Sequence, residues 1–303
     1  MIMNAFTVDL EDWFQGLTST NNHPADWEQY EKRVERNVLQ LLAIFREYGV
    51  KATFFVLGRV AHQHPDLIRQ IEAEGHEIGI HGYWHLHVRR ITPERFADEL
   101  DKALEAVTPL VKEPIIGHRA PYFSIDGHSL WALDILKEKG FEYDSSFFPT
   151  WNMLYGYPKA PRFPHQHEQA GLYEFPVSTA RWLGRNWPVA GGFYLRFFPY
   201  ELTRRGIRQI NRDGQPAILY LHPWEIDVNQ GYRKVTLRER LTHYYGREKL
   251  TTKLHRLFTD FQFVPLRQLY LLGQAVASEP PSLSGGMQLS PVDSLPFNTR
   301  DML

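Results

Sequence analysis

The chain of 303 residues contains no cysteine, which excludes disulfides and thiolate metal sites. A bound metal ion would therefore have to be held by histidines and carboxylates. Basic and acidic side chains nearly balance, with 34 Lys plus Arg against 35 Asp plus Glu. The sequence thus lacks the basic excess that would indicate a nucleic acid or an anionic membrane as a partner.

Long apolar runs are also missing. No stretch approaches about 18 uninterrupted apolar residues, so we expect no transmembrane helix. The N-terminal sequence MIMNAFTVDLEDW has neither a positively charged leader nor a long apolar core, so we expect no signal peptide. A cytoplasmic location follows as the default expectation.

Short apolar segments alternate with amphipathic ones along the chain, a pattern typical of parallel β/α folds. The apolar segments lack polar alternation, as expected of strands that are buried on both faces. Strands are predicted at 4–10, 51–58, 76–82, 114–121, 141–146 and 216–225, and helices at 26–48, 65–74, 92–110 and 127–139. The sequence therefore predicts a parallel β/α domain, either a barrel or a wide sheet.

We expect one domain over residues 1–277. Within it, 146–200 is rich in Pro, Gly and aromatics and is expected to form a loop-rich insert, and 230–277 a C-terminal helical extension. Residues 278–303 are rich in Pro, Ser and Gly without periodicity, which predicts a flexible tail.

Ionisable residues collect where the predicted strands end. In parallel β/α folds these ends meet on one side of the sheet, where ligands bind. Each group alone has an ordinary structural explanation, such as a solvated loop or a paired core residue. The residues at these ends are Asp9, Glu11, Asp12, His81, His85, His118, Arg119, Asp144, His222 and Glu225. Their coincidence on one side indicates a site.

Two histidines and a carboxylate suit a divalent ion of the zinc type, with Zn²⁺ expected first and Co²⁺ or Ni²⁺ as alternatives. Such a set leaves coordination positions open for water and substrate, which a catalytic metal needs. His81 and His85 have a suitable spacing. The third ligand is open: Glu11 shares a strand face with Asp9, whereas a turn after Leu10 would favour Asp12.

Five sequence blocks, in order, resemble the polysaccharide deacetylases of carbohydrate esterase family four, the NodB-homology type. They are TVDLED (7–12), HGYWH (81–85), RAPYFS (119–124), YDSS (143–146) and YLHPWE (220–225). The resemblance implies a distorted (β/α)7-type barrel with helices outside. Residues 174–200 resemble a subgroup found with exopolysaccharide export and exosortase loci.

The resemblance also implies roles for individual residues. Asp9 matches the general base, and Arg119 the arginine that holds it. His81 and His85 match the metal-binding histidines. The backbone N–H of Tyr122 matches half of the oxyanion site. His222 matches the general acid, whose charge Asp144 is expected to tune.

The expected function is therefore metal-dependent removal of N-acetyl or O-acetyl groups from a bacterial polysaccharide, in exopolysaccharide biosynthesis. Trp84, Tyr122, Trp187 and Trp224 are candidates for a cleft in which sugars stack on rings, although these aromatics could equally pack the barrel mouth. Two alternatives are a hydrolase of small amides or imides and an inactive sugar-binding component of a polysaccharide assembly complex. A carboxylate-pair glycosidase would leave the three histidines without a role.

Overall fold

The computed structural model describes residues 2–16, 24–151, 156–167, 170–231, 233 and 235–278. Within these ranges, parallel strands lead into the sequence blocks quoted above. Their order in the main sheet is β10-β1-β2-β3-β4-β5-β7, with parallel pairing throughout. Their bounds are β1 Asn4–Leu10, β2 Thr53–Val56, β3 Glu77–Ile80, β4 Gly117–His118, β5 Tyr143–Asp144, β7 Tyr173–Glu174 and β10 Ile218–Leu221. Short strands β6 (His165–Gln166) and β11 (Phe263–Val264) pair with β7 and β1.

The two ends of this sheet meet at Ser178, just beyond β7. Its backbone N–H donates to the carbonyl of Ile218 (3.1 Å), and its hydroxyl accepts from the Ile218 N–H (2.7 Å). The sheet therefore curls into a ring that one residue completes. This arrangement confirms the predicted distorted β/α barrel.

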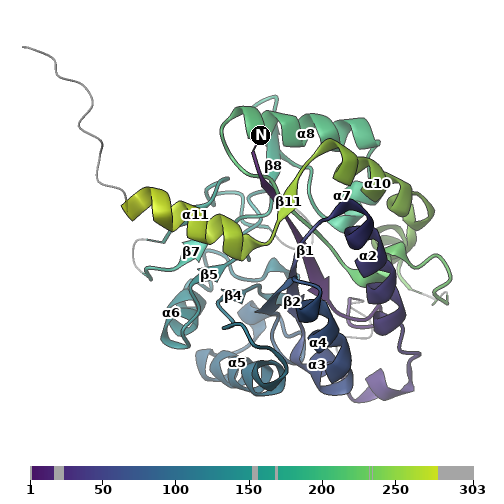
Figure 1. Cartoon of the computed structure of the whole chain (residues 1–303). Helices are drawn as coiled ribbons and strands as arrows, with labels where there is room; N and C mark the ends of the chain where they lie inside the picture. Colours follow the sequence, from purple (N-terminus) through teal and green to yellow (C-terminus); the bar gives the residue numbers. More distant parts are fainter. Residues whose placement is uncertain are drawn as a thin grey trace, which may run out of the picture.

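Helices lie around the outside of the sheet (Figure 1). They are α2 Val34–Tyr48, α3 Gly58–Gln63, α4 Pro65–Ala73, α5 Pro93–Val107, α6 Trp131–Glu138, α7 Gly192–Phe197, α8 Tyr200–Arg212, α9 Leu237–Glu239, α10 Leu250–Asp260 and α11 Leu266–Ser278. Among the helices of the described ranges, none has the length and apolar character needed to span a membrane.

The start of the predicted helix over 26–48 is corrected by the structure. Residues Pro24–Gln29 form a separate 3₁₀ turn, and α2 begins only at Val34. The later start coincides with a carboxylate supplied from outside the helix, described below. The predicted tail lies outside the described residues from residue 279 onward, and the proposed insert and extension boundaries stay predictions.

Alternation along β1 separates the two faces of the sheet. Phe6 points outward, where its ring meets Phe45 of α2 (5.7 Å) and Phe258 of α10 (5.1 Å). Ala5 belongs to a separate buried cluster inside the ring, together with Phe55, Ile116, Tyr143, Phe175, Ile218 and Leu266. Because side chains alternate along a strand, Asp9 shares the inner face with Ala5.

Candidate active site

Three buried side chains converge at the carboxyl ends of β1 and β3. Glu11 follows β1, and His81 and His85 follow β3. One ligand atom from each lies within 4.8 Å of the others, and the three residues are 1–3% exposed. This is the His/His/carboxylate set that the sequence proposed, and its donor atoms are close enough to share one ion.

The ring of His81 is oriented by a backbone carbonyl. Its Nδ1 lies 2.8 Å from the carbonyl oxygen of Arg119. Since a carbonyl only accepts, Nδ1 carries the proton and Nε2 is left with its lone pair. Burial lowers the pKa of His81 to about 4, so the imidazole is neutral at physiological pH, as a metal ligand must be.

Glu11 is held on both of its carboxylate oxygens. Oε1 accepts a hydrogen bond from the indole Nε1 of Trp224 (3.0 Å), and Oε2 lies 2.7 Å from Nε2 of His85. Burial opposes its ionisation, but His85 and His222 outweigh burial and lower the pKa of Glu11 to about 2. An ionised carboxylate and two imidazoles in a dry site fit a divalent zinc-type ion.

Asp12 lies elsewhere and has a different task. Its Oδ2 accepts from the backbone N–H groups of Arg33 (2.8 Å) and Val34 (3.1 Å), and its Oδ1 from that of Trp13 (2.8 Å). These N–H groups include the first of α2, whose own N-cap Arg33 makes no side-chain cap. Asp12 therefore caps α2 from a distance, and the group described above includes Glu11 and not Asp12.

Arg119 fixes Asp9 inside the ring. The guanidinium is fully buried and donates from Nη1 to Asp9 Oδ1 (2.7 Å) and to the Thr7 hydroxyl (2.6 Å). Its other nitrogens donate to the carbonyl and hydroxyl of Ser145, and its plane lies over Phe55. Every side of the guanidinium is thus occupied, and the second oxygen of Asp9 is left facing the site.

His222 approaches from β10, on the other side of β1. Its Nε2 lies 3.9 Å from Asp9 Oδ2 and 3.7 Å from Glu11 Oε1, and its side chain is 21% exposed. Burial opposes protonation, but Glu11, Glu225 and Asp9 raise the pKa of His222 to about 9. The histidine can therefore carry a proton at Nε2, next to the inner carboxylates.

The prediction that Asp144 tunes the charge of His222 is wrong. Asp144 pairs with His118 (2.7 Å) and accepts from the Ser146 hydroxyl (2.8 Å). On β5, Tyr143 belongs to the inner cluster, so its neighbour Asp144 points to the outer face. The carboxylate beside His222 is Glu225, whose Oε2 lies 3.4 Å from Nδ1.

Tyr122 lies in a strained turn beside His85. Its backbone has φ 58° and ψ 18°, the left-handed region, and its ring lies 4.5 Å from that of His85. For a non-glycine residue this conformation costs on the order of 1–3 kcal/mol, and such residues gather at functional sites. The geometry places Tyr122 at the site and does not test its predicted oxyanion role.

One member of the predicted aromatic cleft is buried. Trp224 is 5% exposed and its ring stacks with those of His222 (4.8 Å) and His243 (4.1 Å). With so little of this ring exposed, its assignment to substrate is corrected. Trp84 packs beside Trp27 (5.8 Å). Trp187, 41% exposed, lies in the hairpin of β8 (Thr179–Trp182) and β9 (Arg185–Pro188).

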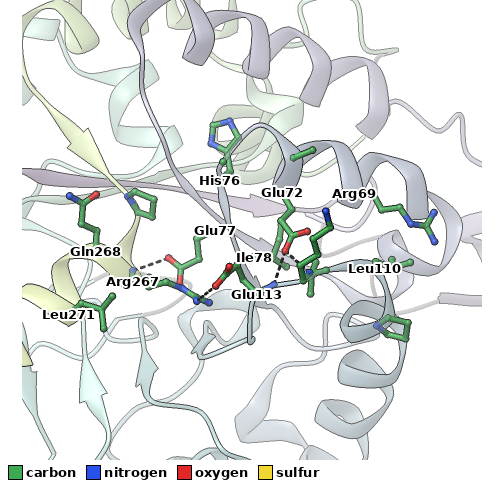
Figure 2. Close-up of a pocket in the computed structure, with 16 residues that line it drawn as sticks. Arg69, Glu72, His76, Glu77, Ile78, Leu110, Glu113, Arg267, Gln268 and Leu271 are labelled. Carbon is green, nitrogen blue, oxygen red and sulfur yellow. Dashed lines mark hydrogen bonds and ion pairs between the residues drawn. The ribbon is translucent and has the colours of Figure 1, made fainter.

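A pocket at the opposite end of the barrel is shown in Figure 2. Glu77, the first residue of β3, borders it and accepts from Thr53 (2.7 Å), Tyr143 (2.7 Å) and the backbone N–H of Arg267 (2.9 Å). Glu72 likewise accepts from the backbone of Lys112 (2.6 Å). These acidic groups are used to fix the start of α11 and neighbouring loops, so the pocket lacks converging reactive groups.

Comparison with known families agrees with this geometry. Residues 27–143, which include both histidines and Arg119, match the family described as polysaccharide deacetylase. Over this part the chain is similar to the polysaccharide deacetylase family. Residues 145–271 match a domain of unknown function, DUF3473, and supply His222 and Glu225. The site thus draws on both matched segments and on β1.

Curated relatives match over shorter stretches. A peptidoglycan deacetylase of Helicobacter pylori is 28% identical over 148 residues, covering 48% of this chain and 49% of that protein. A chitooligosaccharide deacetylase of a Bradyrhizobium species is 34% identical over 97 residues, covering 32% of this chain and 42% of that protein. The match therefore spans less than half of either relative.

Two solved structures share the fold over nearly the whole chain. A Mycobacterium smegmatis protein assigned to the polysaccharide deacetylases has a TM-score of 0.64 at 22% identity and covers 93% of each chain. An allantoinase has a TM-score of 0.59 at 14% identity and covers 92% of each chain. At these identities the likeness concerns the fold alone.

Proposed function

We propose that this protein is a metal-dependent deacetylase that hydrolyses acetyl groups, N-acetyl groups first, on a polysaccharide or oligosaccharide. One observation carries the proposal: Asp9, fixed by Arg119, and His222 flank the Glu11/His81/His85 group from two sides. The names of the curated relatives support the substrate class. A role in exopolysaccharide biosynthesis rests on the resemblance of residues 174–200 and is part of the same proposal.

Hydrolysis of an acetamide needs an activated water, a stabilised oxyanion and a protonated leaving amine. A zinc-type ion held by Glu11, His81 and His85 supplies Lewis-acid polarisation and activation of water when bound. Asp9, held in place by Arg119, takes a proton at Oδ2. His222 gives its Nε2 proton to the departing amine, and the Tyr122 N–H donates to the oxyanion.

A second candidate is a hydrolase of small amides or imides. The fold shared with an allantoinase supports it, because the same barrel there serves a small substrate. An inactive sugar-binding protein has less support, since a base, an acid and a complete ligand set lie together in this chain.

The test is acetate release from N-acetylated chitooligosaccharides and peptidoglycan fragments, with and without chelator and with Zn²⁺, Co²⁺ or Ni²⁺ added back. We expect release that chelation abolishes and metal restores. His81→Ala should lose both bound metal and activity, whereas Asp9→Asn should keep metal and lose activity. Hydrolysis of allantoin or other small amides without acetate release would favour the second candidate. Stoichiometric metal with no hydrolysis of any substrate would contradict both.

A further inference from the structure

We propose that Arg196 is a positioning residue that acts through Glu225 on His222, and that residues 145–271 contribute this support to the site together with His222 itself. The inference rests on the proposed function, in which His222 is the acid. The five sequence blocks did not include Arg196. It lies 29 positions before Glu225, so the contact between the two residues is not visible in the sequence.

Arg196 is built into the protein interior. It is 1% exposed and lies at the end of α7, where Nε and Nη2 contact Glu225 Oε1 at 3.0 and 2.8 Å. Its remaining donors reach the backbone carbonyls of Thr242 (2.5 Å), His243 (3.4 Å) and Tyr245 (2.5 Å). The guanidinium thus connects Glu225 to the turn at 242–245, which contains none of the proposed catalytic residues.

Glu225 divides its two oxygens between Arg196 and His222. Oε1 belongs to Arg196, and Oε2 accepts from the backbone N–H of His222 (3.0 Å) and lies 3.4 Å from its Nδ1. Nε2 of the same imidazole faces Asp9 and Glu11. The backbone carbonyls at 242–245 thus hold Arg196, which contacts Glu225. Glu225 in turn contacts His222, whose other nitrogen faces Asp9 and Glu11.

The backbone of Gly192 packs directly against the carboxylate of Glu225. A Cβ placed on Gly192, the first residue of α7, would lie 1.3 Å from Glu225 Oε2. Gly192 must therefore be glycine for Glu225 to reach His222. Substitution of Gly192 should displace the Glu225 carboxylate while both Glu225 and Arg196 keep their charges. The variant therefore tests the position of Glu225 apart from its charge.

The chemistry gives a readout that general damage would not produce. An acetamide needs a proton on its departing amine, whereas para-nitrophenyl acetate releases a stable phenolate and needs no acid. If Arg196 acts through His222, weakening the Arg196–Glu225 pair should slow only the first reaction. Damage to the metal site or to Asp9 should slow both reactions.

The test compares Arg196→Lys, Glu225→Gln and Gly192→Ala with Glu201→Gln, a control that removes an exposed ion pair of α8. For the first three we expect kcat on an N-acetylated oligosaccharide to fall about tenfold or more, within the range of general acid catalysis. Turnover of para-nitrophenyl acetate and bound metal should change less than about twofold, and the control should change neither.

Two further results decide the matter whatever the activity. In metal-free protein, a nitrogen-15 NMR spectrum of the imidazoles should show the His222 signals moved by Arg196→Lys and unmoved by Glu201→Gln. Unmoved His222 signals in a folded Arg196→Lys protein, or an equal loss on both substrates, would overturn the proposal. A wild type that hydrolyses neither substrate but shows the NMR shift would refute the proposed function while leaving the Arg196–Glu225–His222 linkage in place.

Discussion

Replacing Trp224 with Phe should weaken metal binding through a single lost hydrogen bond. The indole Nε1 donates to Glu11 Oε1 at 3.0 Å, and the ring is held between His222 and His243. Phe keeps an aromatic ring at this position, although a smaller one, and removes the donor. A hydrogen bond to a buried charged group contributes about 1.5–3 kcal/mol.

The same loss can be approached from the metal. Partners that orient a metal ligand typically contribute about 10–100-fold in affinity, and this range corresponds to about 1.4–2.8 kcal/mol. Both routes therefore give one expectation: the Kd for Zn²⁺ or Co²⁺ should rise about 10–100-fold in Trp224→Phe.

The assay is competition for the metal against a chromophoric chelator, with thermal unfolding of the metal-free protein in parallel. Trp187→Phe is the matched control, because its Nε1 donates to the Trp182 carbonyl (3.2 Å) in the exposed hairpin. An unchanged Kd in a folded Trp224→Phe protein would refute the idea that the indole holds Glu11 for the metal.

Three other outcomes follow from the structure. His222→Ala should lower kcat for acetate release by about 10²–10⁴ while bound metal, measured by atomic emission, is retained. Glu11→Gln should lose metal, whereas Asp12→Asn should keep it and lose about 1–3 kcal/mol of stability in denaturant titration, because the amide nitrogen that replaces one carboxylate oxygen cannot accept from the backbone N–H groups which that oxygen satisfied. Burial lowers the pKa of His76 to about 4; the unfolded chain binds this proton near its ordinary pKa of 6.5, so stability is lost as pH falls through that window. His76→Asn keeps an acceptor for the Ala52 N–H but has no imidazole to protonate. Between about pH 7 and about pH 4.5, the free energy of unfolding should therefore fall by about 2 kcal/mol less in this variant than in the wild type.

Residues that depend on local pattern could be predicted from the sequence. The helix predicted over 92–110 begins at Pro93, and the side chain of Thr92 caps it by accepting from the Arg95 N–H. The sequence left Glu11 and Asp12 open as the third ligand, and Glu11 is the one that lies beside His222 together with Asp9, although β1 ends at Leu10. Such features follow from alternation and capping, which the sequence shows directly.

Residues that depend on distant partners could not be predicted. The block YDSS does not say which of two adjacent residues faces inward, and Tyr143 takes that place in a strand of two residues. Asp12 caps a helix that begins 22 positions later. Glu225 was visible at a strand end, but its importance depends on Arg196, which only the tertiary fold brings to it.

The closure at Ser178 has a consequence for motion. Neighbouring strands such as β1 and β2 are joined by a ladder over four registered pairs, but the ring is completed by two hydrogen bonds of one residue. Local opening should begin where the fewest bonds must break together. Amide hydrogen exchange should therefore be faster at Ser178 and Ile218 than in the β1–β2 ladder, while β10, with His222, stays attached to β1 through four registered pairs of its own.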